Sequence, residues 1–139
     1  MRIRYFSTLP EEARAIRAAV FIDEQGFTDD VDEMDDYATH AVLYKEDRPV
    51  AACRFFEIPE GKGRFRIGHI AVMKEYRKRG YGSTLVSLVE SEIKERGGEE
   101  LVLHAQCQAA GFYEKLGYCC SGEIEPGERF SHVWMIKRL

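Results

Sequence analysis

Hydrophobic and polar residues follow one another in short segments whose spacing predicts a series of strands and helices. The apolar segment 3–6 predicts a first strand. Apolar residues then recur at helical spacing between Pro10 and Gly26, which predicts a helix capped by Ser7 or Thr8 and ended by the glycine. The acidic segment 28–36 has little periodicity and predicts a loop or a short irregular helix.

Strand and helix patterns alternate over the rest of the chain. Residues 41–44 and 50–56 predict a hairpin, and residues 64–73 predict a long strand. Three further strands are predicted near 101–103, 118–121 and 132–136, and two further helices around 85–93 and 109–116. The resulting order, β-α-β-β-β-α-β-α-β-β, predicts an α/β (α+β) fold with a mixed central sheet covered by helices.

Composition narrows the possible functions. The chain has 139 residues, of which 45% are hydrophobic and 32% charged, and this fits a single domain spanning residues 1–139. Its formal net charge of -4 argues against nucleic acid and anionic membranes as partners. Charged residues interrupt every apolar stretch and the N-terminus lacks a signal-peptide pattern, so we expect a cytoplasmic protein without a membrane span.

The cysteines and histidines indicate neither disulfide nor metal chemistry. Cys53, Cys107, Cys119 and Cys120 form no C-x-x-C pair, and we expect free, mostly buried thiols in a reducing compartment. The four histidines are scattered rather than set at ligand spacing. The sequence therefore predicts no metal site.

The segment 70–83 is the most informative, because a strand pattern leads into a basic loop and then directly into a helix pattern. Amide N–H groups in the first turn of a helix have no internal partners, and the helix dipole adds partial positive charge there. Gly80 and Gly82 lack the Cβ atoms that would keep a phosphate away from those amides. The basic triplet 77–79 adds full charges, so we predict a site for a phosphorylated ligand.

Two common phosphate loops are excluded by their spacing. No G-x-x-x-x-G-K-[ST] sequence occurs in the chain, so it has no P-loop. A Rossmann turn would need a third glycine where Leu85 stands and an acidic residue after the next strand, where Ala105 and Gln106 stand. The remaining interpretation of this loop is a diphosphate site with a different geometry.

Two motifs resemble those of the GNAT superfamily of N-acetyltransferases. The R-x-x-G-x-G sequence at 77–82 is similar to the loop with which that family binds the pyrophosphate of acetyl-CoA. The segment 110–118, AGFYEKLGY, is similar to its second conserved segment and follows at the right distance. Segments 20–26 and 38–40, with H-x-x-M at 132–135, resemble a branch of small bacterial enzymes described as ElaA-like or YjcF-like.

The resemblance implies a mostly antiparallel sheet, flanked by helices on both faces, that splays open in a V to hold acetyl-CoA. One central strand would pair with the pantetheine arm, and an amine would attack the thioester directly while backbone amides near Val72 polarise the carbonyl. Tyr113 would protonate the departing CoA thiolate or donate a hydrogen bond to it. The residues implied at the cofactor are Ile70, Ala71, Val72, Arg77, Lys78, Arg79, Gly80, Tyr81, Gly82, Ser83, Phe112 and Tyr113.

Helical spacing predicts where Tyr113 points. Phe112 and Leu116 lie four residues apart and supply the core face of their short helix. Tyr113 is therefore expected to face a cleft, and the alternative is an ordinary helix tyrosine.

No single residue stands out as the general base that an attacking amine requires. A lysine-like amine with a pKa of about 10.4 needs more help than an α-amine near about 8. The candidates are Glu24, His104, His132 and the acidic positions Asp30, Asp32 and Glu33. Glu24 and His104 are the predicted catalytic positions besides Tyr113, with a surface carboxylate as the alternative for Glu24. His69 is expected to be a packed strand histidine.

The acceptor is expected to be a small-molecule or peptide amine. Its predicted contacts are Glu24, Gln25, Asp32, Glu33 and His132. If the acidic run 29–36 borders the cleft, it would attract a cationic substrate, and otherwise it is a solvated loop. A non-catalytic acyl-CoA-binding module of the same fold is the alternative function. Strands after Pro126 could exchange or pair between subunits, so a homodimer is also considered.

Overall fold

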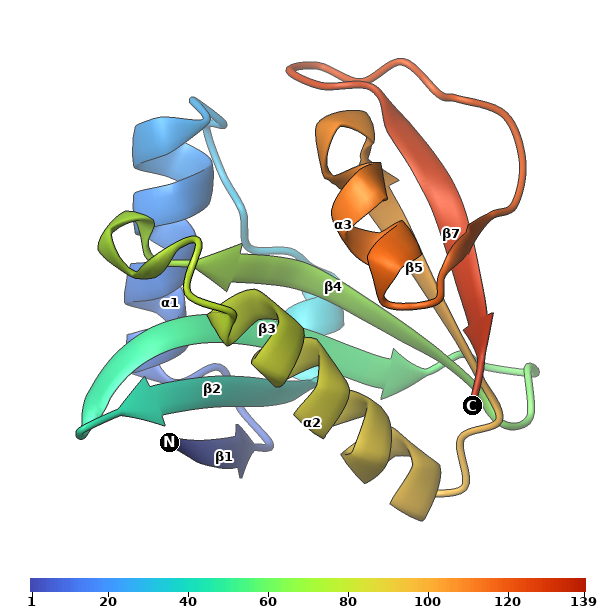
Figure 1. The fold of residues 1–139 in the computed structure, drawn as a ribbon, viewed down its shortest axis with the longest axis horizontal. Helices are drawn as coiled ribbons and strands as arrows, with labels where there is room; N and C mark the ends of the chain where they lie inside the picture. The colour runs from blue at the N-terminus through green and yellow to red at the C-terminus, as the bar shows by residue number, and fades with distance from the viewer.

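A computed structural model describes residues 1–139 and contains one seven-stranded sheet in the order β1-β2-β3-β4-β5-β7-β6 (Figure 1). The strands are β1 (Arg2–Phe6), β2 (Thr39–Lys45), β3 (Arg48–Glu57), β4 (Arg64–Val72), β5 (Glu100–Gln106), β6 (Cys119–Cys120) and β7 (His132–Arg138). The helices are α1 (Glu11–Arg17), its π-helical continuation η1 (Ala18–Glu24), α2 (Tyr81–Glu95) and α3 (Ala110–Lys115). Short 3-10 turns are η2 (Glu33–Asp36), η3 (Lys74–Tyr76) and η4 (Cys107–Ala109).

The predicted order of strands and helices is confirmed, with local differences. The first helix has Pro10 as its N-cap and no side-chain cap, so the expected capping by Ser7 or Thr8 is wrong. A proline suits this place because its fixed φ is compatible with helix entry. The acidic segment forms the short helix η2, capped by the side chain of Asp32.

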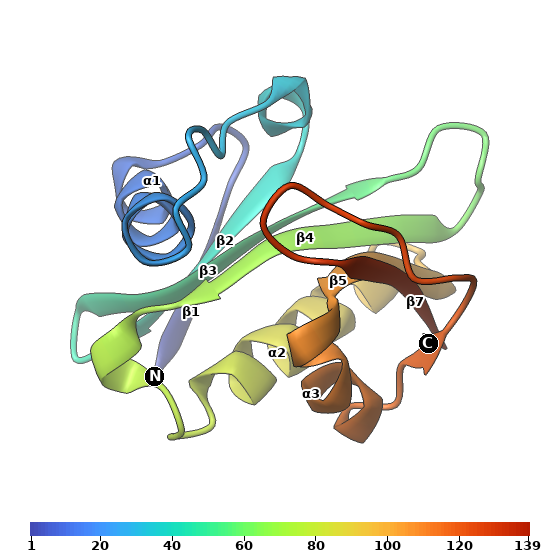
Figure 2. The same ribbon diagram turned by 90° about the horizontal axis from the view of Figure 1, so that it is seen from above.

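Helices cover both faces of the sheet, as predicted. Figure 2 shows α1 on one side and α2 with α3 on the other. The larger apolar core lies on the α2 and α3 side and includes Leu85, Val89 and Leu103. A smaller core lies under α1 and includes Ile16 and Val42. Successive side chains of β2, β3 and β4 point to opposite faces of the sheet, and both faces are buried there.

Strands β4 and β5 are the only parallel neighbours, and they are paired over a short stretch. Arg64, Phe65 and Arg66 pair with Glu100, Leu101 and Val102, and every other neighbouring pair of strands is antiparallel. Beyond these residues β4 and β5 diverge (Figure 1). The mixed, mostly antiparallel sheet with a V-shaped splay is therefore confirmed.

A β-bulge bends β4 where it leaves β5. The register with β3 changes from Ala52 opposite Ala71 to Arg54 opposite Gly68, which leaves an extra residue in β4. His69 in this bulge has a φ of 49°, a conformation that costs a non-glycine residue free energy. Bulges increase twist and bend the strand that carries them, so this one supports the divergence of β4 from β5.

The four cysteines are free, but the expectation that most are buried is wrong, because only Cys53 is buried and Cys107 is partly exposed. Cys53 is buried in the core, whereas Cys119 and Cys120 are exposed. The reason is that β6 is a two-residue strand at the edge of the sheet. No helix has the length and apolar character needed to cross a bilayer.

Candidate active site

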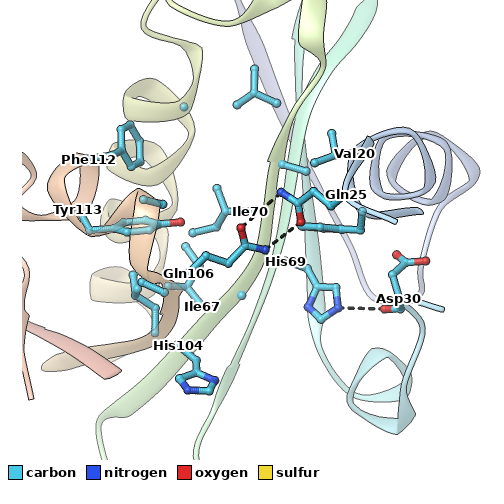
Figure 3. A pocket seen from close by; sticks show the side chains of 18 of the residues that line it. Val20, Gln25, Asp30, Ile67, His69, Ile70, His104, Gln106, Phe112 and Tyr113 are labelled. Carbon is cyan, nitrogen blue, oxygen red and sulfur yellow. Dashed lines mark hydrogen bonds between the residues drawn. The ribbon is translucent and has the colours of Figure 1, made fainter. Parts of the chain in front are cut away.

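A pocket with a volume of about 600 Å³ fills the splay between β4 and β5 (Figure 3). Its walls come from both strands, the end of η1, the first turns of α2 and α3, and the start of β7. Because β5 leaves β4 after Arg66, the edge of β4 from Ile67 to Val72 faces this pocket without a strand partner. Free backbone groups on such an edge can pair with an extended ligand.

The predicted anion loop enters the pocket at the far end of β4. Gly80 is the N-cap of α2 with a φ of 83°, a left-handed conformation that glycine adopts without strain. The side chains of Arg77, Lys78 and Arg79 are exposed beside the free amides of the first turn of α2. The ring of Tyr81 is buried in the core, so only its backbone is available to a ligand.

Gly82 and Phe112 form the wall between the loop and α3. A Cβ atom on Gly82 would lie 3.2 Å from Cζ of Phe112 and 3.5 Å from a methyl group of Val72. The absence of a side chain thus lets α2 approach Phe112 and Val72 closely, in addition to leaving the helix amides accessible. Gly82 and Phe112 were both expected at the cofactor, and both line the pocket.

Tyr113 lies on the core face of α3, although Phe112 and Leu116 were expected to supply that face. Its side chain is 8% exposed, whereas that of Phe112 is 37% exposed. The hydroxyl group nevertheless points from α3 into the pocket (Figure 3). Burial raises the pKa of Tyr113 above its usual value, so the phenol is protonated at neutral pH. The prediction of cleft access stands for the hydroxyl, and the assignment of Phe112 to the core was wrong.

Glu24 forms an ion pair with the anion loop and is absent from the pocket wall. Its carboxylate accepts hydrogen bonds from Nη1 and Nη2 of Arg77, at 2.7 and 2.5 Å. The pKa of Glu24 is lowered by these hydrogen bonds, which makes the carboxylate a weak base. Nε of Arg77 donates to the carbonyl of Val72 at 3.0 Å. Glu24 is therefore positioned to orient Arg77 rather than to accept a proton from an acceptor amine.

Gln25 was expected to contact the acceptor, and it lies across the mouth of the splay. Nε2 of Gln106 donates to Oε1 of Gln25 at 2.9 Å, which joins the end of η1 to the end of β5 (Figure 3). The loop between β6 and β7 folds toward the same place (Figure 2). There Nε of Arg129 donates to the Gln25 carbonyl at 3.0 Å, and the rings of Phe27 and Phe130 lie 6.1 Å apart. These contacts enclose the half of the pocket opposite the cofactor loop.

His69 is a pocket residue that strand alternation failed to predict. The bulge interrupts the alternation, so His69 and Ile70 both line the pocket. Nε2 of His69 lies 2.9 Å from the carbonyl of Asp30, which can only accept, so this nitrogen carries the proton in the neutral ring. Burial, with smaller contributions from Arg54 and Arg17, lowers the pKa of His69 to about 4. Its imidazole is neutral at pH 7.

His104 and His132 lie side by side on the floor of the same half. Their ring centroids are 4.8 Å apart, and His104 also stacks on Trp134 at 4.4 Å. Nε2 of His104 is buried and has no hydrogen-bond partner, although Oε1 of Glu125 lies 3.3 Å away. Burial and the neighbouring His132 lower the pKa of His104, and Glu125 partly offsets them. Both predicted histidines are therefore brought into the pocket.

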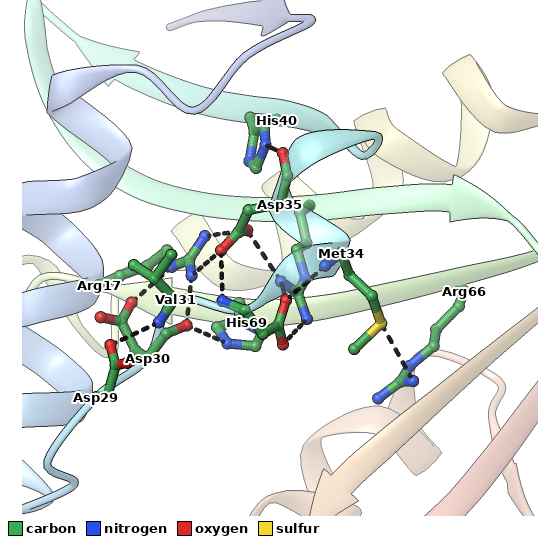
Figure 4. Close-up of polar contacts among 11 residues, drawn as sticks. Arg17, Asp29, Asp30, Val31, Met34, Asp35, His40, Arg66 and His69 are labelled. Carbon is green, nitrogen blue, oxygen red and sulfur yellow. Dashed lines mark hydrogen bonds and ion pairs between the residues drawn. The ribbon is translucent and has the colours of Figure 1, made fainter.

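Part of the acidic run forms a charge cluster with Arg17 and Arg54 (Figure 4), whereas Asp29, Glu33 and Asp36 are exposed. Asp35, whose side chain is 4% exposed, accepts hydrogen bonds from Arg17 at 2.8 and 3.0 Å and from Arg54 at 2.9 Å. Both oxygens of Asp32 accept from Arg54, at 2.5 and 2.9 Å. Neither Asp32 nor Glu33, which were expected to contact the acceptor, is part of the pocket wall.

Comparison with known proteins agrees with these features. A family model described as the acetyltransferase (GNAT) family matches residues 5–118. YyaT of Bacillus subtilis is 40% identical, over 92% of this chain and 88% of its own. YjcF of the same organism, described as an uncharacterized N-acetyltransferase, is 32% identical over 83% of this chain and 81% of its own.

Solved structures share the fold. Escherichia coli ElaA superimposes with a TM-score of 0.84 at 23% identity, covering 98% of this chain and 99% of its own. An aminoglycoside 6'-N-acetyltransferase crystallised with coenzyme A gives a TM-score of 0.76 at 21% identity, covering 99% and 97% of the two chains. The expected ElaA-like and YjcF-like resemblance is confirmed.

Replacing Glu24 with Gln tests whether this carboxylate is a general base or an anchor for Arg77. If Glu24 only anchors Arg77, E24Q should change the turnover number less than about threefold. If Glu24 were the general base, its loss would lower the turnover number about 100-fold or more. With Glu24 as an anchor, the effect should instead fall on KM for the CoA substrate. Steady-state kinetics measure both, and D23N, at the exposed neighbouring carboxylate, is the matched control. A 100-fold loss of kcat in E24Q alone would contradict the anchor role.

Replacing Asp35 with Asn should destabilise the fold by about 3 kcal/mol, because two buried arginines lose their shared carboxylate. Burial opposes ionisation of Asp35, but hydrogen bonds from Arg17 and Arg54 outweigh it and hold the pKa well below its usual range. The stabilisation is therefore complete above about pH 4, the ordinary aspartate range, and is lost as pH falls further. Urea unfolding between pH 3 and 7 measures it. The exposed D36N is the control, and equal stability of the two variants would contradict the role of the cluster.

Proposed function

The chain belongs to the GNAT acetyltransferase family, and from this premise we propose that it transfers the acetyl group of acetyl-CoA to a primary amine by direct attack. It is an acyltransferase, and acetyl-CoA is its cosubstrate. The observation that carries the proposal is the pocket between β4 and β5, where an unpaired strand edge meets a glycine loop at one end and the Tyr113 hydroxyl in the middle.

Acetyl-CoA would lie along the free edge of β4. The pyrophosphate would accept hydrogen bonds from the amides of the loop 77–83, with Lys78 and Arg79 as further cations. The pantetheine arm would pair with the backbone of the segment 70–72 as an added strand. Arg77, held by Glu24 and by the Val72 carbonyl, would keep the loop closed on this edge.

The reaction would proceed without an acyl-enzyme. The amine nitrogen attacks the thioester carbonyl, the carbonyl oxygen becomes an oxyanion next to backbone amides near Val72, and the C–S bond then breaks. The amine loses one proton and the CoA thiolate gains one, so the products are the N-acetylated amine and CoA. Positioning supplies much of the rate because thioesters are already activated.

Tyr113 would serve the leaving thiolate as a hydrogen-bond donor. A thiol has a pKa of about 8.5 and an unperturbed tyrosine about 10, so full proton transfer from the phenol is uphill by about 2 kcal/mol. Burial raises the pKa of Tyr113 further, which makes transfer still less favourable and keeps the donor proton in place. A hydrogen bond from the phenol stabilises the developing charge on sulfur without requiring that transfer.

His104 is the proposed proton acceptor for the attacking amine. A general base works best with a pKa near the operating pH. His69, with a pKa of about 4, is too weakly basic for this role, and Glu24 is held by Arg77. His104 lines the pocket and is kept neutral by burial, and Oε1 of Glu125, 3.3 Å from the buried Nε2, would stabilise the imidazolium once the ring has accepted a proton. Its ring is fixed between Trp134 and His132.

Tyr113→Phe tests the chemistry. We expect kcat to fall about 100- to 1,000-fold, as when one donor to a transition-state charge is removed, while the Kd for acetyl-CoA changes less than about threefold. Free-CoA release with a thiol reagent, measured over a panel of amines, gives kcat. Y118F is the matched control, because the Tyr118 hydroxyl donates to Glu90 away from the pocket.

Unchanged turnover in Y113F would contradict the role of Tyr113. Tight acetyl-CoA binding without CoA release for any amine would instead favour the alternative, a non-catalytic acyl-CoA-binding module.

A further inference from the structure

The half of the pocket opposite the loop 77–83, where the acceptor amine would bind, contains a half-buried arginine without a counter-charge. The side chain of Arg66 lines the pocket, and its only side-chain hydrogen bond goes to the sulfur of Met34 at 3.8 Å. Figure 4 shows its guanidinium beside the Met34 sulfur and apart from the carboxylates of the acidic cluster. Burial and the neighbouring Arg54 lower the pKa of Arg66, as expected for a cation that lacks a carboxylate partner.

The carboxylates that could have paired with Arg66 are already engaged. Asp30 and Asp35 bind Arg17, and Asp32 binds Arg54. Asp29, which lines the pocket, accepts a hydrogen bond from the Val31 amide through its carboxylate. Taking part of a guanidinium out of water is costly, and an anionic partner offsets that cost. The missing partner of Arg66 is thus expected to come with a ligand.

Arg66 lies near His104, the proposed base, because both side chains contact Trp134. Its guanidinium carbon lies 5.0 Å from the Trp134 ring centroid, and the His104 ring stacks on the same indole at 4.4 Å. Arg66 pairs with Val102 in β5, two residues before His104. Two residues of strand correspond to roughly 7 Å. An amine at His104 and an anion at Arg66 would therefore be a short distance apart.

We propose that the acceptor is a short amine that also carries a carboxylate or phosphate group, and that Arg66 binds this group. The inference rests on the proposed acetyl transfer and names its substrate class. An arginine fork matches both carboxylate and phosphate through paired N–H donors. The Trp134 ring beneath holds the guanidinium in place through a cation–π contact. The hypothesis of a cationic acceptor is less favoured, because Asp30, Asp32 and Asp35 of the acidic run are already paired with Arg17 and Arg54.

Matched acceptors test the proposal through kcat/KM for acetylation. β-Alanine is compared with β-alaninamide, and phosphoethanolamine with ethanolamine, so that each pair differs in the anionic group. Glycine and γ-aminobutyrate vary its distance from the amine. We expect one or both acids to be preferred over their neutral analogues by at least about tenfold, the effect of one hydrogen-bonded charge. The carboxylate and phosphate pairs distinguish the two possible groups.

Variants of Arg66 then assign the effect to this side chain. R66M keeps an apolar stem beside Met34 and should raise KM for the acid about tenfold or more while leaving the neutral analogue and acetyl-CoA unchanged. R66K keeps the charge but lacks the fork of N–H donors, so its KM for the acid should lie between those of the unmodified protein and R66M. R64M is the control, because exposed Arg64 lies on the same strand, outside the pocket, and pairs with Glu100.

Calorimetry with the CoA-saturated protein adds a readout that does not depend on turnover. Binding of the acid and not of its neutral analogue, lost in R66M, supports the subsite. Acetylation of acids and neutral analogues at equal rates, or an equal loss of both in R66M, overturns the acceptor class and leaves the acetyltransferase proposal intact. Absence of both turnover and selective acid binding overturns the subsite, while failure of acetyl-CoA itself to bind overturns the proposed function.

Discussion

The short parallel pairing of β4 and β5 is the constraint on which the site depends. The two strands share hydrogen bonds from Arg64 to Arg66, and divergence begins there. A sheet that stayed paired would bury the edge of β4, and no pocket would exist. A sheet that separated fully would lose the common core beneath both strands. The bulge at His69 supports the divergence at the cost of a strained φ, which is a common feature of functional sites.

Polar groups outside the sheet hold the opened strands in place. On one side, the cluster of Arg17, Arg54 and Asp35 fixes the segment between η1 and β2 against β3. Buried ion pairs contribute little net stability, but they penalise any arrangement that separates one partner from the others. Across the mouth, the amides of Gln25 and Gln106 bond to each other and set the distance between η1 and β5. The pocket is therefore shaped by interactions that specify geometry more than they stabilise the fold.

Sequence reasoning succeeded where the chemistry is local. The loop from Arg77 to Gly82 is contiguous, and a helix start with two glycines determines most of what it can bind. Tyr113 was harder, because the spacing of Phe112 and Leu116 on a six-residue helix does not decide which side meets the core. His69 was missed because one extra residue in β4 reverses the alternation. The buried ion pairs of Asp35 were not predicted, because its partners, Arg17 and Arg54, are distant in sequence and only the fold brings them together.

The distribution of charge in the pocket suggests how two anionic substrates could share it. Basic side chains stand at one end, in the loop 77–79, and Arg66 stands at the other. Six residues of β4 separate Arg66 from Val72, which corresponds to roughly 20 Å, or about 2.5 Debye lengths at physiological ionic strength. Between these ends Ile70 is aliphatic, burial keeps the Tyr113 phenol and the His69 ring uncharged at pH 7, and the Asp30 carboxylate is paired with Arg17. Under the proposed acceptor class, each anion is neutralised at its own end. The thioester and the amine then meet in the uncharged middle, where a developing oxyanion is stabilised most strongly by nearby donors.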